Sequence, residues 1–115
     1  MDDDRLSGKV RVLKAMAHPA RLAMIESLAH GERCVCDLQR LVGSDMSTVS
    51  KHLALMKAAG VVADRKEGQW VYYRLRVPCI LRFFDCLDAV LEEAESHPAG
   101  VCSPHEKIAK RKEMT

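Results

Sequence analysis

Residues 44–60 have the sequence Ser-Asp-Met-Ser-Thr-Val-Ser-Lys-His-Leu-Ala-Leu-Met-Lys-Ala-Ala-Gly, which predicts one amphipathic helix. Ser44 or Asp45 is expected to cap the first turn by accepting from its free backbone N–H groups. Gly60 is expected to end the helix in a left-handed conformation. Apolar residues recur at three- and four-residue spacing and predict a buried stripe: Met46, Val49, Leu53 and Met56.

The opposite face of this helix carries short hydroxyl side chains and two cationic or potentially cationic groups: Ser47, Thr48, Ser50, Lys51 and His52. Hydroxyl and Lys side chains suit contacts with phosphate oxygens, and Thr and His side chains can contact base edges in a DNA groove. Such a face is also typical of an ordinary solvent-exposed helix. The segment that follows favours the DNA-binding interpretation.

A β-hairpin is predicted directly after this helix. An apolar, β-branched run begins at Val61, Glu67-Gly68 is a turn signal, and residues 70–75 are rich in aromatic and β-branched side chains. A helix with a DNA-contacting face followed by a two-stranded ribbon with a polar, basic tip indicates a winged helix-turn-helix. The tip supplies three further candidate DNA contacts: Arg65, Lys66 and Gln69.

Further helices are expected before this unit. Residues 9–17 and 20–29 predict two helices that meet at His18-Pro19, with Pro19 at the first position of the second helix. Residues 34–41 predict the next helix, and Gly43 makes the short break that forms the turn of the helix-turn-helix. His18 is predicted to have a structural role at the helix junction. Arg21 and Lys57 are predicted to be solvated surface charges.

A last helix is expected from Pro78 to about Ser96. Its apolar face is too broad for the terminal helix of a small monomer, so we expect a homodimer formed through the first and last helices. Residues 1–98 are assigned to one DNA-binding and dimerisation domain, and residues 99–115 to a polar, flexible C-terminal tail. The apolar face comprises Ile80, Phe83, Phe84, Leu87, Val90, Leu91 and Ala94.

The composition of the chain narrows its class. The 115 residues carry a formal net charge of only +2, so any nucleic-acid surface is expected to be local. No run of about 18 apolar residues predicts a membrane span, and the acidic N-terminus lacks an apolar signal region, so a cytoplasmic protein is expected. The 5 cysteines are then expected to be reduced, and the close Cys34–Cys36 pair favours thiol chemistry or metal binding over disulfides.

Several motifs together resemble the ArsR/SmtB family of metal-responsive repressors, and the match extends from about Val10 to about Leu91. The resemblance implies a mainly α-helical, homodimeric winged helix-turn-helix that binds an inverted repeat in double-stranded operator DNA and is not an enzyme. The motifs are Ala-His-Pro-Ala-Arg-Leu at residues 17–22, Glu-Arg-Cys-Val-Cys-Asp-Leu at residues 32–38, and the helix and hairpin at residues 47–62 and 64–75.

Cys34-Val-Cys36 matches the arsenic-type signature of that family, so the resemblance implies trivalent arsenite or antimonite as an inducer bound by soft thiolates. The family's arsenic pattern often carries a third cysteine after Asp-Leu, where this chain has Gln39. The site is therefore either two-coordinate in protein sulfur or includes a distant cysteine, for which Cys102 is the candidate. Side chains at i and i+2 of a regular helix do not face each other, so the two thiols converge only if the helix start is irregular.

Other functions remain open at the level of sequence. A repressor of the same fold that responds to cysteine oxidation or to another soft metal is one alternative, and a thiol enzyme is a remote one. The zinc pattern is weakened because Leu87 stands where a histidine is expected, and the cadmium/lead pattern because no cysteine precedes Cys34. Cys79 and Cys86 are interpreted as structural small hydrophobes. The operator sequence and the choice between inorganic and methylated arsenic stay undetermined.

Overall fold

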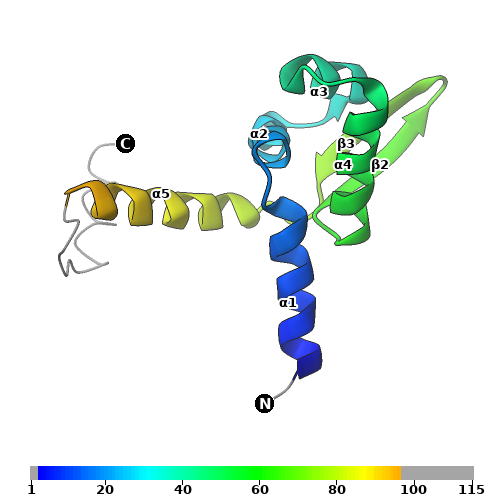
Figure 1. The fold of residues 1–115 in the computed structure, drawn as a ribbon. Coiled ribbons are helices and arrows are strands. Elements are labelled where there is room, and N and C mark those ends of the chain that lie inside the picture. Colours follow the sequence, from blue (N-terminus) through cyan, green and yellow to red (C-terminus); the bar gives the residue numbers. More distant parts are fainter. Residues whose placement is uncertain (1–2, 97–115) are drawn as a thin grey trace. The chain divides into compact units, whose positions relative to one another are not determined.

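The computed structural model describes residues 3–96, and the chain forms two compact units that divide between Pro78 and Cys79. The fold is the predicted winged helix-turn-helix, mainly helical with a small antiparallel sheet (Figure 1). Its elements are α1 (Asp3–Met16), α2 (Pro19–Ser27), the short 3-10 helix η1 (Leu28–His30), β1 (Arg33–Cys34), α3 (Val35–Val42), α4 (Met46–Ala58), β2 (Val62–Glu67), β3 (Trp70–Leu75) and α5 (Ile80–Ser96).

Helices α2, α3 and α4 pack against one another and supply the core of the first unit. The apolar stripe predicted for α4 is confirmed at Val49, Leu53 and Met56, which are fully buried together with Met24, Ile25 and Leu38. Met46 is an exception, since it is the first residue of α4 and its side chain is 39% exposed. Its position at the helix start directs it away from the core and leaves it for the surface groove described below.

Local signals explain both ends of α4, the recognition helix. Asp45 is the N-cap, because its Oδ1 accepts from the backbone N–H of Thr48 at 2.9 Å. Gly43, at φ +78, ends α3 and permits the tight turn between the two helices. At the other end Gly60 has φ +86, and the N–H of Val61 donates to the carbonyl oxygen of Met56 at 2.9 Å. Both predicted turn glycines are therefore confirmed.

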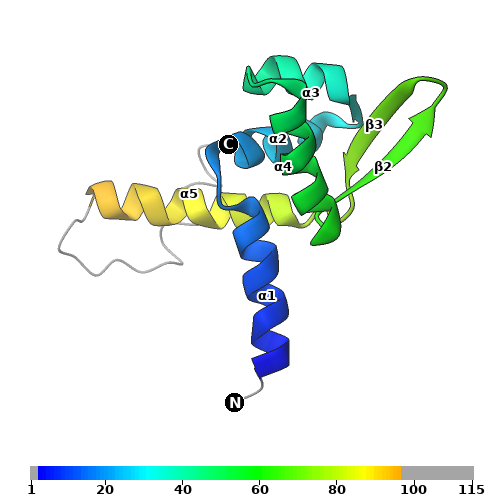
Figure 2. The same ribbon diagram turned by 45° about the vertical axis from the view of Figure 1, so that its right-hand side comes forward.

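The sheet has one strand more than the sequence predicted. Its order is β1-β3-β2, with both pairings antiparallel. β1 occupies the position where the helix at 34–41 was expected to begin, so α3 starts at Val35 and Cys34 has extended backbone. A strand of two residues carries no periodic signal and depends on distant partners, here Tyr72 and Tyr73. The β2–β3 hairpin, called the wing below, projects to the side of α3 and α4 (Figures 1 and 2).

The remaining boundaries differ modestly from the predictions. α1 begins at Asp3 instead of Lys9, and α2 ends at Ser27, where η1 continues the chain. α5, in the second unit, begins at Ile80 instead of Pro78. No helix within residues 3–96 is both long and apolar enough to cross a membrane. The predicted tail at 99–115, including Cys102, lies outside the described residues.

Both helices proposed for dimerisation present large apolar side chains to solvent in the single chain. On α5 the exposed fraction is 61% for Val90 and 60% for Leu91. On α1 the exposed apolar residues are Val10 and Leu13. Exposed apolar faces of this kind are typical of protein interfaces. The exposed apolar set on α5 is Phe83, Leu87, Val90 and Leu91.

Candidate DNA-binding surface and thiol site

The first turns of α4 present the predicted polar face. Ser47, Ser50 and Lys51 are exposed, and Thr48 is half-buried. Lys51 makes no ion pair with any residue in the part of the chain that the structure describes. The hydroxyl and N–H of Thr48 hold the pKa of Asp45 below its ordinary value, so the cap carboxylate stays ionised at the helix start. The hydroxyl groups and Lys51 are thus available to a ligand that approaches this face.

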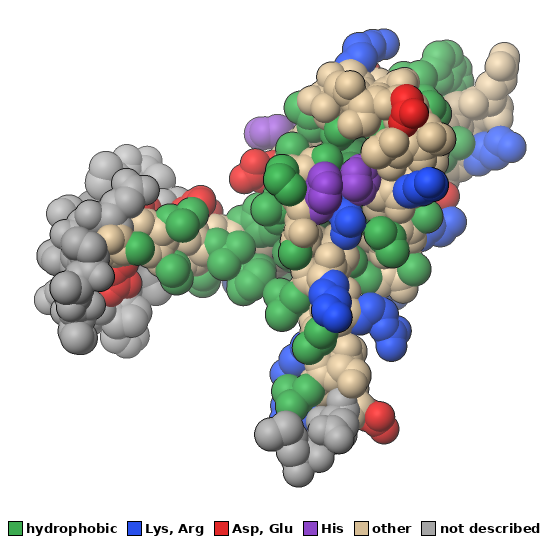
Figure 3. Space-filling model, in the orientation of Figure 1, with side chains coloured by type: hydrophobic (Ala, Val, Ile, Leu, Met, Phe, Trp, Pro, Cys, Tyr) green, Lys and Arg blue, Asp and Glu red, His purple; other side chains and the backbone are tan. Residues whose placement is uncertain are grey.

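His52 differs from the other residues of this face because its half-buried ring contacts two side chains of the protein itself. Its Nδ1 accepts from Nε of Arg21 at 3.1 Å, and its ring centroid lies 4.5 Å from that of His18. Neighbouring histidine side chains, with Lys and Arg beside them, are seen in Figure 3. His18 is itself the N-cap of α2, since its Nδ1 accepts from the N–H of Ala20 at 3.0 Å. The structural role predicted for His18 is confirmed.

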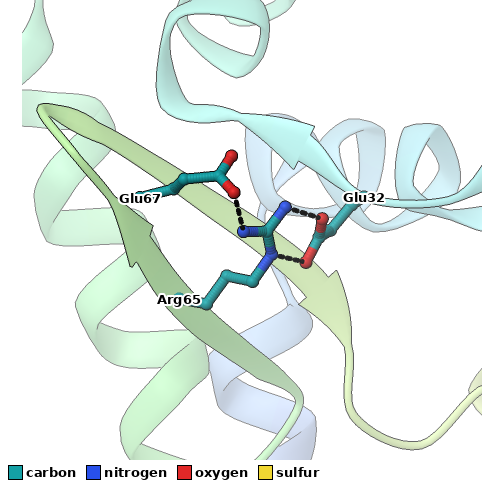
Figure 4. A network of polar contacts seen from close by, with 3 residues as sticks. All are labelled: Glu32, Arg65 and Glu67. Atoms are coloured by element: carbon teal, nitrogen blue, oxygen red, sulfur yellow. Dashed lines mark hydrogen bonds and ion pairs between the residues drawn. The ribbon is translucent and has the colours of Figure 1, made fainter.

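The three candidate DNA contacts of the wing have different surroundings. Lys66, next to the last residue of β2, and Gln69, which follows Gly68 in the turn, are exposed, and their side chains make no hydrogen bond or ion pair within residues 3–96. Arg65 instead binds both carboxylate oxygens of Glu32, from Nε at 2.7 Å and from a terminal nitrogen at 2.8 Å (Figure 4). Lys66 and Gln69 are the wing side chains left for a partner.

Arg65 also contacts two further groups. A terminal nitrogen lies 3.4 Å from Glu67, and the guanidinium lies 4.6 Å from the centre of the Tyr72 ring. The Glu32 carboxylate raises the pKa of Arg65, and the Arg65 guanidinium lowers the pKa of Glu32. Two carboxylates therefore balance the charge of Arg65, in contrast to the free cation expected at a wing tip.

Lys57 is exposed at the surface, as the sequence suggested, and its side chain also reaches the wing. Its Nζ lies 3.0 Å from the carboxylate of Asp64 on β2. Asp64 is paired with Tyr73 across the hairpin, so this face of the sheet is the one turned towards α4. The ion pair fixes the wing next to the recognition helix.

The two cysteines of the thiol segment, residues 34–36, are half-buried at the junction of β1 and α3. Cys34 is paired with Tyr72, which is paired in turn with Arg65, so these three side chains share the face of the sheet turned away from α4. Cys36 instead lines a groove with Tyr73 on the α4 side. Cys34 is the N-cap of α3 and has the extended backbone of β1, whereas Cys36 lies in the first turn of the helix, so the two thiols come from different elements.

The groove beside Cys36 lies between the recognition helix and the wing and has a volume of about 370 Å³. Trp70, the single tryptophan of the chain, is 53% exposed at its rim. The groove is mainly apolar and aromatic, with two polar side chains from the candidate DNA surface. Its lining comprises Val35, Cys36, Met46, Ser50, Gln69, Trp70, Val71 and Tyr73.

Cys79 and Cys86 belong to the second unit of the chain. Cys79 lies in the turn before α5 and Cys86 on α5, and both are exposed in the single chain, which contradicts their interpretation as buried hydrophobes. Cys102, the candidate third ligand, lies outside the described residues. Within residues 3–96, no group of three or more His, Cys, Asp or Glu side chains is placed to hold a metal ion.

Sequence reasoning missed Glu32 and Tyr72 as partners of the wing arginine. Glu32 and Arg65 are 33 residues apart, and no periodic or motif signal links them. Arg65 and Lys66 lie between two acidic residues, Asp64 and Glu67, but the sequence does not show which carboxylates bind Arg65. Only the pairing of β1 with β3 brings these groups together.

Known proteins that resemble this chain are transcriptional regulators. A family profile described as "Bacterial regulatory protein, arsR family" matches residues 18–64. The "Arsenical resistance operon repressor" of Escherichia coli (strain K12) is 40% identical over 67 residues, which cover 57% of this chain and 57% of the relative. A "Cadmium resistance transcriptional regulatory protein CadC homolog" of Staphylococcus aureus is 41% identical over 66 residues, covering 56% of this chain and 54% of the relative.

This chain therefore spans little more than half the length of these curated relatives. A solved structure is similar over more of its length. It is the homodimeric winged helix-turn-helix DNA-binding domain of a possible ArsR-family transcriptional regulator from Mycobacterium bovis, with a TM-score of 0.72 and 32% identity over 87% of this chain and 93% of that chain. Relatives named for two different ions are about equally similar, so identity alone does not select the ligand.

Proposed function

Since the chain belongs to the ArsR family of bacterial regulatory proteins, we propose that it is a cytoplasmic, homodimeric repressor of transcription that binds an inverted repeat in double-stranded operator DNA. The polar face of α4 supplies base and phosphate contacts through Ser47, Thr48, Ser50 and Lys51. Two recognition helices related by a two-fold axis then contact half-sites about 34–36 Å apart. Exposed apolar faces on α1 and α5 support dimerisation through the first and last helices.

The proposed inducer is trivalent arsenic or antimony, bound by the thiolates of Cys34 and Cys36. The observation that carries this proposal is the position of both cysteines at the junction between β1 and α3, the helix that precedes the recognition helix. Thiolates are soft ligands that suit such ions, and Cys102 remains the candidate for a third sulfur. Similarity to the arsenical resistance repressor of Escherichia coli supports the same choice.

Side chains two residues apart at a helix start do not face each other, so we expect binding of one ion by both thiols to rearrange the thiol segment. Cys34 must leave its pairing with Tyr72, or Cys36 must leave the groove beside the recognition helix. Either movement disturbs the support of the DNA-binding surface. An ion that binds the rearranged form better than the DNA-bound form shifts the population away from DNA, as an inducer must.

Titration of operator DNA with purified protein, with and without arsenite, tests this function. Cys34→Ser and Cys36→Ser are expected to bind operator normally and to lose the response to arsenite. Cys79→Ser and Cys86→Ser are matched controls that should respond as the wild type does. If the double variant Cys34→Ser/Cys36→Ser is still released at wild-type arsenite concentrations, the thiol segment is not the sensor.

A soft divalent ion is the second candidate inducer. The similarity to the Staphylococcus aureus cadmium resistance homolog favours it, because thiolates also bind such ions. The same titration with cadmium and with methylarsenite in place of arsenite separates the candidates. The ion that releases operator at the lowest concentration, and only from protein with both Cys34 and Cys36, is the inducer.

A further inference from the structure

We propose that the ion pair between Glu32 and Arg65, called the clamp below, couples the thiol segment to the wing, so that inducer binding displaces the wing from DNA. This inference rests on the proposed function and adds a route from the thiols to the DNA surface. Glu32 and Arg65 act as positioning residues, because they are argued to work through the segments that they join.

The contacts around the clamp link the thiol segment to the wing by two routes, through Glu32 and through Cys34. Glu32 lies two residues before Cys34, and its carboxylate binds Arg65 of β2 through two hydrogen bonds. Arg65 lies over the ring of Tyr72 on β3. Tyr72 is paired across the sheet with Cys34, which returns the path to the thiol segment. A movement of Cys34 is therefore transmitted to both strands of the wing.

The geometry of the clamp makes it stiff. A guanidinium that binds a carboxylate through two parallel hydrogen bonds fixes orientation as well as distance. Glu67 holds a third side of the same guanidinium at 3.4 Å, as Figure 4 shows. The side chains of Arg65 and Glu32 are 48% and 30% exposed, so the ion pair lies at the surface and its constraint comes from the two parallel hydrogen bonds. A single exposed ion pair on a flexible stem has no such constraint.

The charge balance indicates that the clamp positions the wing and does not itself bind DNA. The guanidinium of Arg65 is shared between two carboxylates, whereas Lys66 next to it is exposed and makes no ion pair within residues 3–96. A phosphate that approached Arg65 would compete with Glu32 and Glu67. Lys66 and Gln69 at the tip are the groups that depend on the orientation which the clamp sets.

Chelation by Cys34 and Cys36 opposes this arrangement. Cys34 shares one face of the sheet with Tyr72 and Arg65, while Cys36 lies in the first turn of α3 and lines the groove beside α4. Bringing both sulfurs to one ion rotates the backbone between them and pulls on Glu32 or on the pairing of β1 with β3. With the clamp intact, the wing must follow; without it, the segment rearranges more freely.

The experiment compares Glu32→Gln and Arg65→Lys with the wild type and with Asp37→Asn. Glu32→Gln removes the charge, and Arg65→Lys keeps the positive charge but lacks the fork that binds two oxygens. Asp37→Asn is the matched control, because it removes an ion pair with Arg40 that lies 3.3 Å away on α3 and does not reach the wing. Circular dichroism checks that each variant is folded.

Three quantities are measured for each protein: arsenite affinity without DNA, operator affinity with and without arsenite, and Trp70 emission on arsenite addition. The ratio of the two operator dissociation constants is the coupling factor, which is typically about 5–150-fold in allosteric proteins. Trp70 begins β3, is the single tryptophan of the chain and lines the groove beside Cys36, so its emission reports on the wing together with that groove.

Both clamp variants are expected to bind arsenite at least as tightly as the wild type, with a coupling factor that falls towards one and a smaller arsenite-induced change in Trp70 emission. Asp37→Asn should behave as the wild type. Wild-type coupling in both clamp variants, or an equal loss in Asp37→Asn, overturns the clamp while leaving the inducer proposal intact. Absence of arsenite release from the wild type itself overturns the proposed inducer and the clamp together.

Discussion

Nε of Arg21 on α2 donates a hydrogen bond to Nδ1 of His52 on α4 at 3.1 Å, across 31 residues of sequence. A terminal nitrogen of the same guanidinium donates to the carbonyl oxygens of Lys14 and Ala15, at 3.1 and 3.2 Å, near the end of α1. One side chain thus joins three helices of the first unit. The interpretation of Arg21 as a solvated surface charge is therefore wrong, and the orientation of His52 is set from within the protein.

This contact predicts a pH-dependent stability. Burial, with the neighbouring charges of His18 and Arg21, holds the pKa of His52 below its ordinary value of 6.5. The unfolded chain then binds the proton more readily, so stability falls as the pH drops from 6.5 through the lowered pKa, and the penalty is absent above 6.5. His52→Asn keeps an oxygen acceptor for Arg21 but does not titrate.

We expect the free energy of unfolding of His52→Asn to depend less steeply on pH than that of the wild type between about pH 7 and pH 5, the range in which histidine titrates. Urea denaturation at several pH values measures both slopes. Gln39→Asn, on the neighbouring helix, is a control for an amide substitution that leaves the histidines unchanged. If the free energy of unfolding depends equally on pH in His52→Asn and in the wild type, protonation of His52 does not cause the pH dependence.

Substitutions on the exposed polar face of α4 are expected to reduce the ability of the protein to distinguish DNA sequences. Ser47 and Ser50 are exposed at the start of α4, the part of the helix that is proposed to approach base edges in the major groove. Removing a base-edge contact, as in Ser50→Ala, should cost about 1–3 kcal/mol of binding free energy and relax specificity at one base pair. The specificity is measured from the affinity for a panel of operators, each of which carries one base-pair substitution. Glu26→Ala, exposed on α2, serves as the control, and identical specificity profiles for all three proteins would refute the assignment of α4.

The wing predicts two different salt dependences. The Lys66 side chain is exposed and makes no ion pair within residues 3–96. Lys66→Ala should therefore weaken binding to DNA of every sequence about equally. It should also reduce the slope of log affinity against log salt concentration by about 0.9. Arg65→Gln should reduce that slope less, because the charge of Arg65 is already balanced by Glu32 and Glu67. Titrations at four salt concentrations give the slopes, and a larger effect for Arg65→Gln would contradict the assignment.

The exposed apolar residues of α5 predict loss of the dimer in Phe83→Asp. A buried charge without a partner is costly, so a carboxylate in an apolar interface should yield monomers or insoluble protein. Sedimentation velocity measures the oligomeric state. Arg82→Asp introduces the same carboxylate one residue away, outside the apolar set, and should remain dimeric. A folded, DNA-binding dimer of Phe83→Asp would exclude this face from the interface.

The local features of this protein follow from its sequence because they depend on neighbouring residues. The helix break at Gly43, the cap at Asp45, the stripe at Val49, Leu53 and Met56, and the hairpin are short-range consequences of periodicity and backbone preference. The Cys34–Cys36 pair was likewise visible as a spacing. These signals were enough to predict the winged helix-turn-helix fold and to identify Cys34 and Cys36 as candidate ligands.

Only the tertiary structure decided which of those side chains remain available to bind DNA or an ion. β1 forms because Arg33 and Cys34 meet Tyr73 and Tyr72 from a strand almost 40 residues later, a pairing too short to leave a periodic pattern. The same long-range pairing brings Glu32 to Arg65, so a predicted DNA contact became part of the wing's support. Contacts between distant segments depend on how the whole core packs, and no local spacing encodes them.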